Sequence, residues 1–137
     1  MTTGYSGTPL AKKLGIKIGF KIGVINAPVY YFDLFEDFPA EVEINADDDS
    51  PKNLIHFFTK QVAELESMIL SLKAQIAPDG TIWISWPKKA SKVPTDITED
   101  VIRNLALVNG LVDVKVCAVD EVWSALKLVI PVKDRKG

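Results

Sequence analysis

Residues 112–132, VDVKVCAVDEVWSALKLVIPV, decide the fold of this chain. Every second residue from Val112 to Ala118 is apolar, and this period of two is typical of a β-strand. A second apolar run begins at Trp123, only a few residues later. A parallel crossover needs about a dozen residues or more, so two strands this close must pair antiparallel. The stretch therefore predicts an antiparallel hairpin.

The elements before this hairpin alternate between helix and strand. The segment 60–76 carries apolar side chains at intervals of three and four, which is typical of an amphipathic helix. Asp96, with Glu99 three residues later, is typical of a capping pair that opens a helix. In chain order we expect a short helix ending before Gly15, a strand at 20–26, a short helix at 29–35, strands at 41–45 and 54–58, a helix at 60–76, a turn at 78–80, a strand at 81–86 and a helix from Asp96 to Asn109.

This order predicts a single α/β domain over residues 1–137, with residues 1–8 as a flexible tail. We expect three layers, about six strands and a mostly parallel, Rossmann-like sheet closed by the hairpin. The composition, 47% hydrophobic and 25% charged, is that of a globular domain. One cysteine permits no internal disulfide, and no apolar run reaches the length of a membrane span, so we expect a cytoplasmic protein with no membrane partner.

The net charge of −2 is a sum over unlike segments. Residues 1–32 contain four lysines and no acid, whereas residues 33–51 contain eight acids and no base. Such an acidic block repels the phosphates that dominate nucleic-acid affinity, so we expect no nucleic-acid partner. Residues 47–49, three consecutive aspartates, lack the glycine and the spaced ligands of a calcium loop, which favours a solvated turn.

Two resemblances follow from these motifs. The stretches GYSGTPLAKKLGIK, GTIWISWPKK, TDITEDVIR and GLVDVKVCAVDEVWSALKLV resemble a bacterial family known only as a domain of unknown function, which implies no activity. The order of elements resembles the second half of class I S-adenosylmethionine methyltransferases. In that fold the last strand inserts antiparallel beside its neighbours, and the resemblance implies a strand order of 2-1-3-4-6-5.

The sequence departs from that fold where a cofactor would bind. A glycine-rich turn after the first strand lets the backbone approach a nucleotide closely. Here Gly23 lies inside the strand, and Pro28 removes an amide donor from the turn. We therefore expect no cofactor.

The most informative place for a site is the crevice beyond the strand ends, near the change in strand order. We expect Asn26 and Pro28 to lie there, with Trp86, Lys88 and Lys89 on the exit of a neighbouring strand. The aromatic ring of Trp86 could stack on a ring of the ligand, and the two lysines could neutralise an anionic group. The alternative is a solvated lysine loop in which Trp86 covers the core.

No catalytic or metal-binding motif is present. His56, the single histidine, lies in an apolar strand, where a neutral, hydrogen-bonded histidine is the favoured interpretation over a catalytic one. Cys117 is favoured as a packing residue rather than a nucleophile. One histidine and one cysteine cannot supply the four ligands of a structural zinc site.

We therefore expect no catalytic residue, and the leading hypothesis is a non-catalytic module that binds a small anionic ligand or a protein partner. The alternatives are an enzyme with a degenerate nucleotide or S-adenosylmethionine site, and a structural protein that forms homo-oligomers.

Overall fold

Six strands form one mixed sheet in the computed structural model, which describes residues 8–46 and 48–135. The spatial order is β2-β1-β3-β4-β6-β5, as the resemblance to class I methyltransferases implies. Strands β1, β2, β3 and β4 run parallel, and β6 is antiparallel to both β4 and β5. The strands are β1 (Lys21–Ile25), β2 (Glu43–Ile44), β3 (Lys52–Phe58), β4 (Ile76–Pro87), β5 (Val112–Ala118) and β6 (Trp123–Val129).

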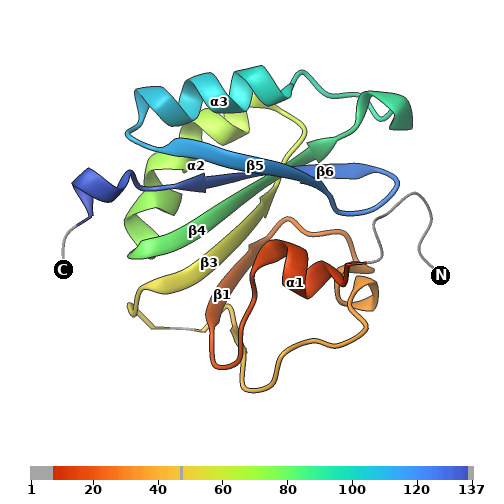
Figure 1. Ribbon diagram of the computed structural model, residues 1–137. Coiled ribbons are helices and arrows are strands. Elements are labelled where there is room, and N and C mark those ends of the chain that lie inside the picture. The colour runs from red at the N-terminus through yellow and green to blue at the C-terminus, as the bar shows by residue number, and fades with distance from the viewer. Residues whose placement is uncertain (1–7, 47, 136–137) are drawn as a thin grey trace.

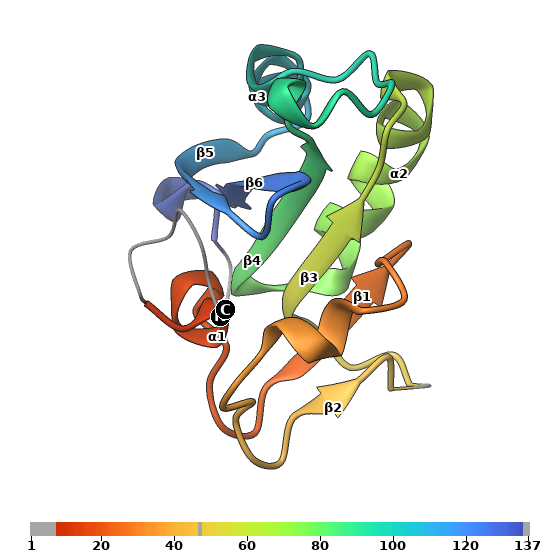
Figure 2. The ribbon, with the colours of Figure 1, turned by 90° about the vertical axis from the view of Figure 1, so that its right-hand side faces the viewer.

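The helices cover both faces of the sheet, which gives the expected three layers (Figures 1 and 2). Helices α2 (Val62–Gln75) and α3 (Glu99–Val108) lie on one face, and α1 (Leu10–Leu14) lies on the other. Short 3-10 helices η1 (Tyr31–Leu34) and η2 (Lys89–Ser91) lie in connections, and η3 (Val132–Asp134) follows β6. The tail predicted at residues 1–8 lies, apart from Thr8, outside the described residues.

Strand β3 shows why the sheet is buried on both faces. Ile55 and Phe57 pack with α2 and α3, whereas Leu54 and Phe58 pack with α1 and η1. Successive side chains of a strand point to opposite faces, so a strand between two helical layers is apolar throughout. The α/β domain therefore has one hydrophobic cluster on each side of its sheet.

Strand β4 begins earlier than the sequence predicts. Lys52 pairs with Ile76 and Leu54 pairs with Thr81, so two steps along β3 match five along β4. The predicted turn is thus a bulge inside β4 rather than a connection before it. A Cβ added at Gly80 would lie 3.0 Å from a backbone oxygen of β3, which explains the glycine at this close approach.

The prediction that Asp96 opens the last helix is wrong. The hydroxyl of Thr98 accepts a hydrogen bond from the amide of Val101 (3.2 Å) and caps α3. The carboxylate of Asp96 instead accepts one from the amide of Val62 (2.8 Å), at the start of α2. The loop before α3 therefore holds the beginning of α2.

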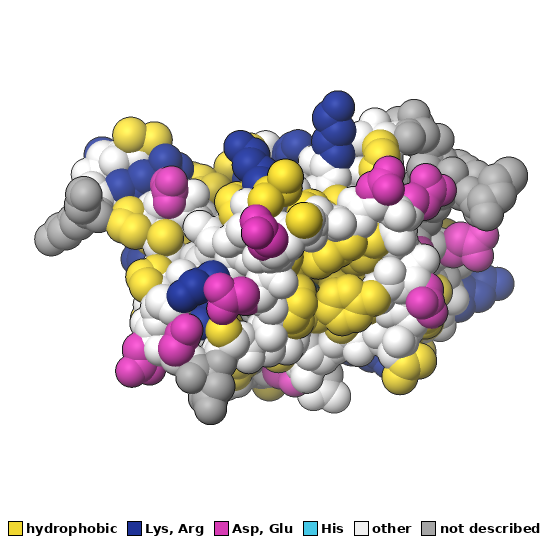
Figure 3. Space-filling view, turned by 90° about the horizontal axis from the view of Figure 1, so that it is seen from below, with side chains coloured by type: hydrophobic (Ala, Val, Ile, Leu, Met, Phe, Trp, Pro, Cys, Tyr) yellow, Lys and Arg dark blue, Asp and Glu magenta, His cyan; other side chains and the backbone are white. Residues whose placement is uncertain are grey.

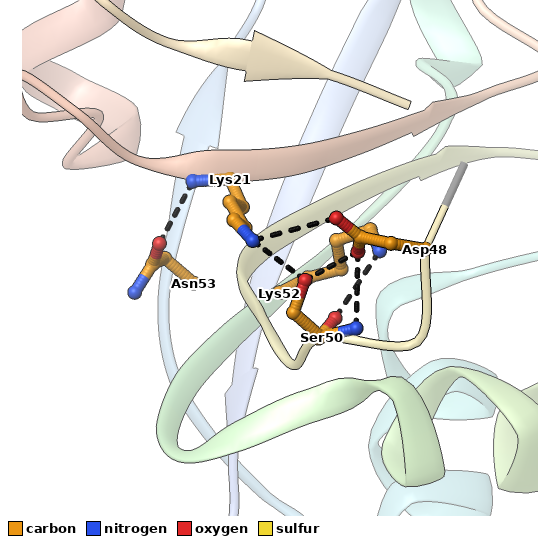
Figure 4. Close-up of polar contacts among 5 residues, drawn as sticks. All are labelled: Lys21, Asp48, Ser50, Lys52 and Asn53. Carbon is orange, nitrogen blue, oxygen red and sulfur yellow. Dashed lines mark hydrogen bonds and ion pairs between the residues drawn. The ribbon is translucent and has the colours of Figure 1, made fainter. Parts of the chain in front are cut away.

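The acidic turn between β2 and β3 is exposed, as predicted, although Asp47 lies outside the described residues. Asp48 accepts hydrogen bonds from the amide and hydroxyl of Ser50, and the Ser50 hydroxyl is the main reason that the pKa of Asp48 is lowered. The ammonium of Lys21 lies 2.6 Å from the Ser50 hydroxyl and 3.5 Å from Asp48 (Figure 4). These contacts close the turn at the amino ends of β1 and β3.

Candidate functional site

The carboxyl ends of β1 and β3 form the place where an open α/β sheet binds its ligands. From β1 the chain passes to β2 on one side, whereas from β3 it passes to β4 on the other. Such a switch point creates a crevice beyond the strand ends. The residues that follow these two strands, Asn26 and Thr59, therefore decide what the crevice can hold.

Side chains of the protein bridge this crevice. The amide of Asn26 donates a hydrogen bond to one oxygen of the Glu64 carboxylate (3.1 Å), and the hydroxyl of Thr59 donates one to the other oxygen (2.5 Å). Glu64 lies in the first turn of α2, where the helix dipole favours a carboxylate. We call Asn26, Thr59 and Glu64 the switch-point cluster. It places a negative charge between the ends of β1 and β3.

The end of β2 is also engaged by the protein itself. The amide of Val24 donates a hydrogen bond to the side-chain oxygen of Asn45 (2.8 Å), and the Asn45 side-chain nitrogen donates one to the Val24 carbonyl (3.2 Å). Asn45 has a positive φ of 52°, a conformation that asparagine tolerates better than most residues. In dinucleotide-binding folds an acidic side chain near this position holds the ribose. Here an amide occupies it and bonds to backbone.

The predicted site residues lie at the ends of two different strands. Asn26 and Pro28 follow β1, whereas Trp86, Lys88 and Lys89 end or follow β4, with β3 between. Trp86 is only 8% exposed and packs in the cluster under α2 and α3.

The lysines after β4 lie beside the start of β6. The amide of Lys88 donates a hydrogen bond to the Val122 carbonyl (2.7 Å), and Lys89 is exposed at the start of η2. The sheet brings all five predicted residues to one end, but Asn26 bonds to Glu64, which the sequence did not single out. A shared ligand site over both strand ends stays a prediction.

A buried chain of polar groups lies on the α1 face of the sheet, across strands β3 and β4. His56 Nδ1 lies 3.0 Å from the Tyr31 hydroxyl, and Nε2 lies 2.7 Å from the Ser85 hydroxyl. His56 is fully buried, and burial lowers its pKa to about 3, while burial raises the pKa of Tyr31. A serine beside a histidine could suggest nucleophilic catalysis, but both are sealed from solvent and the ring is a weak base. His56 is therefore a neutral, hydrogen-bonded histidine, as predicted.

Comparison with solved structures identifies the architecture. A methyltransferase dependent on S-adenosylmethionine from Aquifex aeolicus superposes with a TM-score of 0.59 at 14% identity, over 88% of each chain. A ribosomal protein L11 methylase from Lactobacillus delbrueckii subsp. bulgaricus gives 0.56 at 11%, over 88% of this chain and 74% of that one. An O-methyltransferase of neocarzinostatin biosynthesis gives 0.60 at 6%, over 82% of this chain and 49% of that one.

This chain has the methyltransferase fold. The likeness, at 14% identity or less, concerns the fold alone. No protein-family model matches the chain, and a search of curated proteins found no match either. The resemblance to a bacterial family stays a prediction.

The residues at the switch point do not fit the cofactor that the methyltransferase fold implies. Gly23 lies inside β1, where a Cβ would meet Ile55 at 3.4 Å, and the turn after the strand contains no glycine. The carbonyl of Pro28 accepts the amide of Tyr31 (2.9 Å), so the chain turns at once into the four-residue η1. A nucleotide held on a glycine turn needs free amides and a following helix N-terminus. In this connection Pro28 has no amide hydrogen to donate, and η1 has only four residues.

A transmembrane helix is not present in the part of the chain that the structure describes: none is long and apolar enough to cross a bilayer.

Proposed function

We propose that this chain is a non-catalytic module of methyltransferase fold that works by binding a protein partner. One observation carries the proposal: the Glu64 carboxylate bridges the switch point through Asn26 and Thr59. A ligand that enters between these strand ends competes with these two hydrogen bonds, of which the Asn26 bond is exposed and the Thr59 bond is partly buried. Both are bonds to a charged group, so their displacement opposes ligand binding.

Charge adds to this opposition. An anionic group placed near Glu64 meets a like charge, which raises the free-energy cost of binding it. Nucleotides would present their phosphates to this carboxylate. S-adenosylmethionine carries a positive sulfonium, but its carboxylate and ribose would still need hydrogen-bond donors. The side-chain amides of Asn26 and Asn45 already donate to other groups of the protein.

Calorimetric titration with S-adenosylmethionine, its demethylated product, ATP and NAD tests the proposal. We expect no saturable heat at millimolar ligand for the wild type. Glu64→Gln removes the charge, and Glu66→Gln, on an exposed position of the same helix, is the matched control. Saturable binding to the wild type that Asn26→Ala abolishes, and Glu66→Gln does not, would overturn the proposal.

A second candidate is a small anionic ligand at the loop after β4. Lys89 and Lys92 are exposed there on one short 3-10 turn. Amide chemical shifts of this loop should then move on titration with phosphate or citrate, and the Lys88→Ala, Lys89→Ala double variant should lose the effect. Lys133→Ala, an exposed lysine on η3, is the control. Equal shifts in the double variant would remove this candidate.

A cytoplasmic location, membership of the bacterial family, a single domain and the absence of a nucleic-acid partner belong to the same proposal. The acidic segment 33–51 supports the last of these, because it repels phosphate.

A further inference from the structure

The connection between β1 and β2 exposes apolar side chains. Val29 is fully exposed and Phe32 is 49% exposed, while Tyr30, Phe35 and Phe38 are partly exposed. We call these five residues the aromatic patch. Figure 3 shows hydrophobic side chains gathered at the centre of the face seen from below, the side on which β1 and β2 lie in Figures 1 and 2.

The rings of the patch hold each other in place. Phe38 packs edge-on against Phe32 and Phe35, with ring centroids 5.8 and 5.0 Å apart. Buried Tyr31 contacts Phe32 and Phe35 from beneath, at 5.0 and 5.2 Å. Tyr31 is in turn bonded to His56, so the patch is attached to the core of the sheet.

A second attachment fixes the other end of the patch. The hydroxyl of Tyr30 donates a hydrogen bond to the carboxylate of Asp120 (2.8 Å), in the turn between β5 and β6. The surface is therefore organised before any partner arrives, and binding it costs little ordering of side chains.

Acidic side chains alternate with the patch residues along the chain and follow them. Asp33, Glu36 and Asp37 lie between its rings in sequence and are exposed, and Glu41 and Glu43 follow them. None of these five carboxylates forms a salt bridge with any described residue. Figure 3 shows acidic side chains beside the apolar centre.

We propose that the aromatic patch binds a segment of a partner protein in which an apolar side chain is flanked by lysine or arginine. This inference rests on the proposed function and names its surface. The apolar anchor would cover Phe32, and the basic flanks would meet the unpaired acids, an arrangement of complementary charge that gives both specificity and fast association.

Charge also decides against other occupants. Two copies of the chain docked patch to patch would set acids against acids, because a two-fold interface places the same residues opposite each other. An anionic lipid surface or a nucleic acid is repelled by the same carboxylates. A basic peptide segment is the occupant that the surface favours.

Selection of a random-peptide display library against the immobilised full chain tests this surface. We expect the selected peptides to carry an aliphatic or aromatic residue beside lysine or arginine, and their affinity to fall as salt is raised. Phe32→Ser should weaken their binding at least tenfold. Leu70→Ser, at a position 62% exposed on α2, is the matched control and should leave it unchanged.

A second variant tests the acidic side chains without changing the aromatic ones. Glu36→Lys with Asp37→Lys leaves every aromatic side chain in place and should also weaken binding at least tenfold, with unchanged thermal unfolding. The inference is overturned if no peptide is selected, if the selected peptides lack positive charge, or if neither patch variant affects them. A dimer seen by light scattering and abolished by Phe32→Ser would likewise overturn it.

The two proposals fail separately. Peptides that bind elsewhere on the chain would remove this surface and leave protein binding as the function. Saturable binding of S-adenosylmethionine at the switch point would remove the non-catalytic function, whatever the patch binds.

Discussion

Between pH 7 and pH 5, acid should destabilise this protein through His56. It is the single histidine of the chain, it is fully buried, and burial lowers its pKa from 6.5 to about 3. At a pH between these two pKa values, His56 is therefore protonated in the unfolded chain and neutral in the folded chain. Because the unfolded state then holds more protons, stability is complete above about pH 6.5 and is lost as the pH falls toward 3.

The size of the effect follows from the two pKa values. Between pH 7 and pH 5 the unfolded histidine becomes almost fully protonated while the folded one stays neutral. Linkage then predicts a loss of about 2 kcal/mol in the free energy of unfolding over this interval. Carboxylates titrate mainly below pH 5, so the interval isolates the histidine.

Urea unfolding followed by tryptophan fluorescence at pH 7 and pH 5 measures this loss. His56→Gln keeps hydrogen-bonding capacity but cannot titrate, so its stability should change little between the two pH values, whatever its absolute value. Wild-type stability equal at pH 5 and pH 7, or the same loss in His56→Gln, would refute the assignment of a neutral, buried His56.

Three further predictions concern the fold. Asp96→Ala should lower the free energy of unfolding by about 1 kcal/mol, because Asp96 caps the start of α2 at Val62; thermal unfolding beside the distant exposed control Asp134→Ala measures it, and equal melting temperatures would contradict it. Gly80→Ala should cost about 1–3 kcal/mol by pushing a methyl group to 3.0 Å from backbone oxygen, and urea unfolding unchanged from wild type would show that the bulge adapts. Cys117 should react slowly with iodoacetamide at pH 8, because burial raises its pKa; a rate equal to that of the urea-unfolded chain would be inconsistent with this.

The pairing of β5 with β6 was predictable because it depends on a local constraint, whereas the full strand order followed from the resemblance to class I methyltransferases. Too few residues separate β5 from β6 for any connection other than a hairpin. The boundaries of the strands and helices depended on pairing and capping residues far away in the sequence. Strand β4 extends back to Ile76 because Lys52 pairs with it, and no pattern near residue 76 indicates that. Asp96 was assigned to the wrong helix because the amide it caps lies 34 residues away.

The site was predictable only in its location. The change in strand order named Asn26, but its partner Glu64 lies on another element, 38 residues later. The sequence offered one indication of this contact, an acidic residue in the first turn of the helix that follows β3. An acid at that position is equally well explained by its interaction with the helix dipole. The partners of His56 were hidden for the same reason, since Tyr31 and Ser85 lie 25 and 29 residues from it.

The position of β6 has a consequence for how the protein is made. It follows the other five described strands in the chain, yet it lies inside the sheet, between β4 and β5. Until residues 123–129 emerge, the nascent chain exposes a long β4 edge whose backbone groups have no partner, and β5 has no neighbour to join. Such an edge invites pairing with other chains. The sheet is therefore complete only when β6 inserts between β4 and β5.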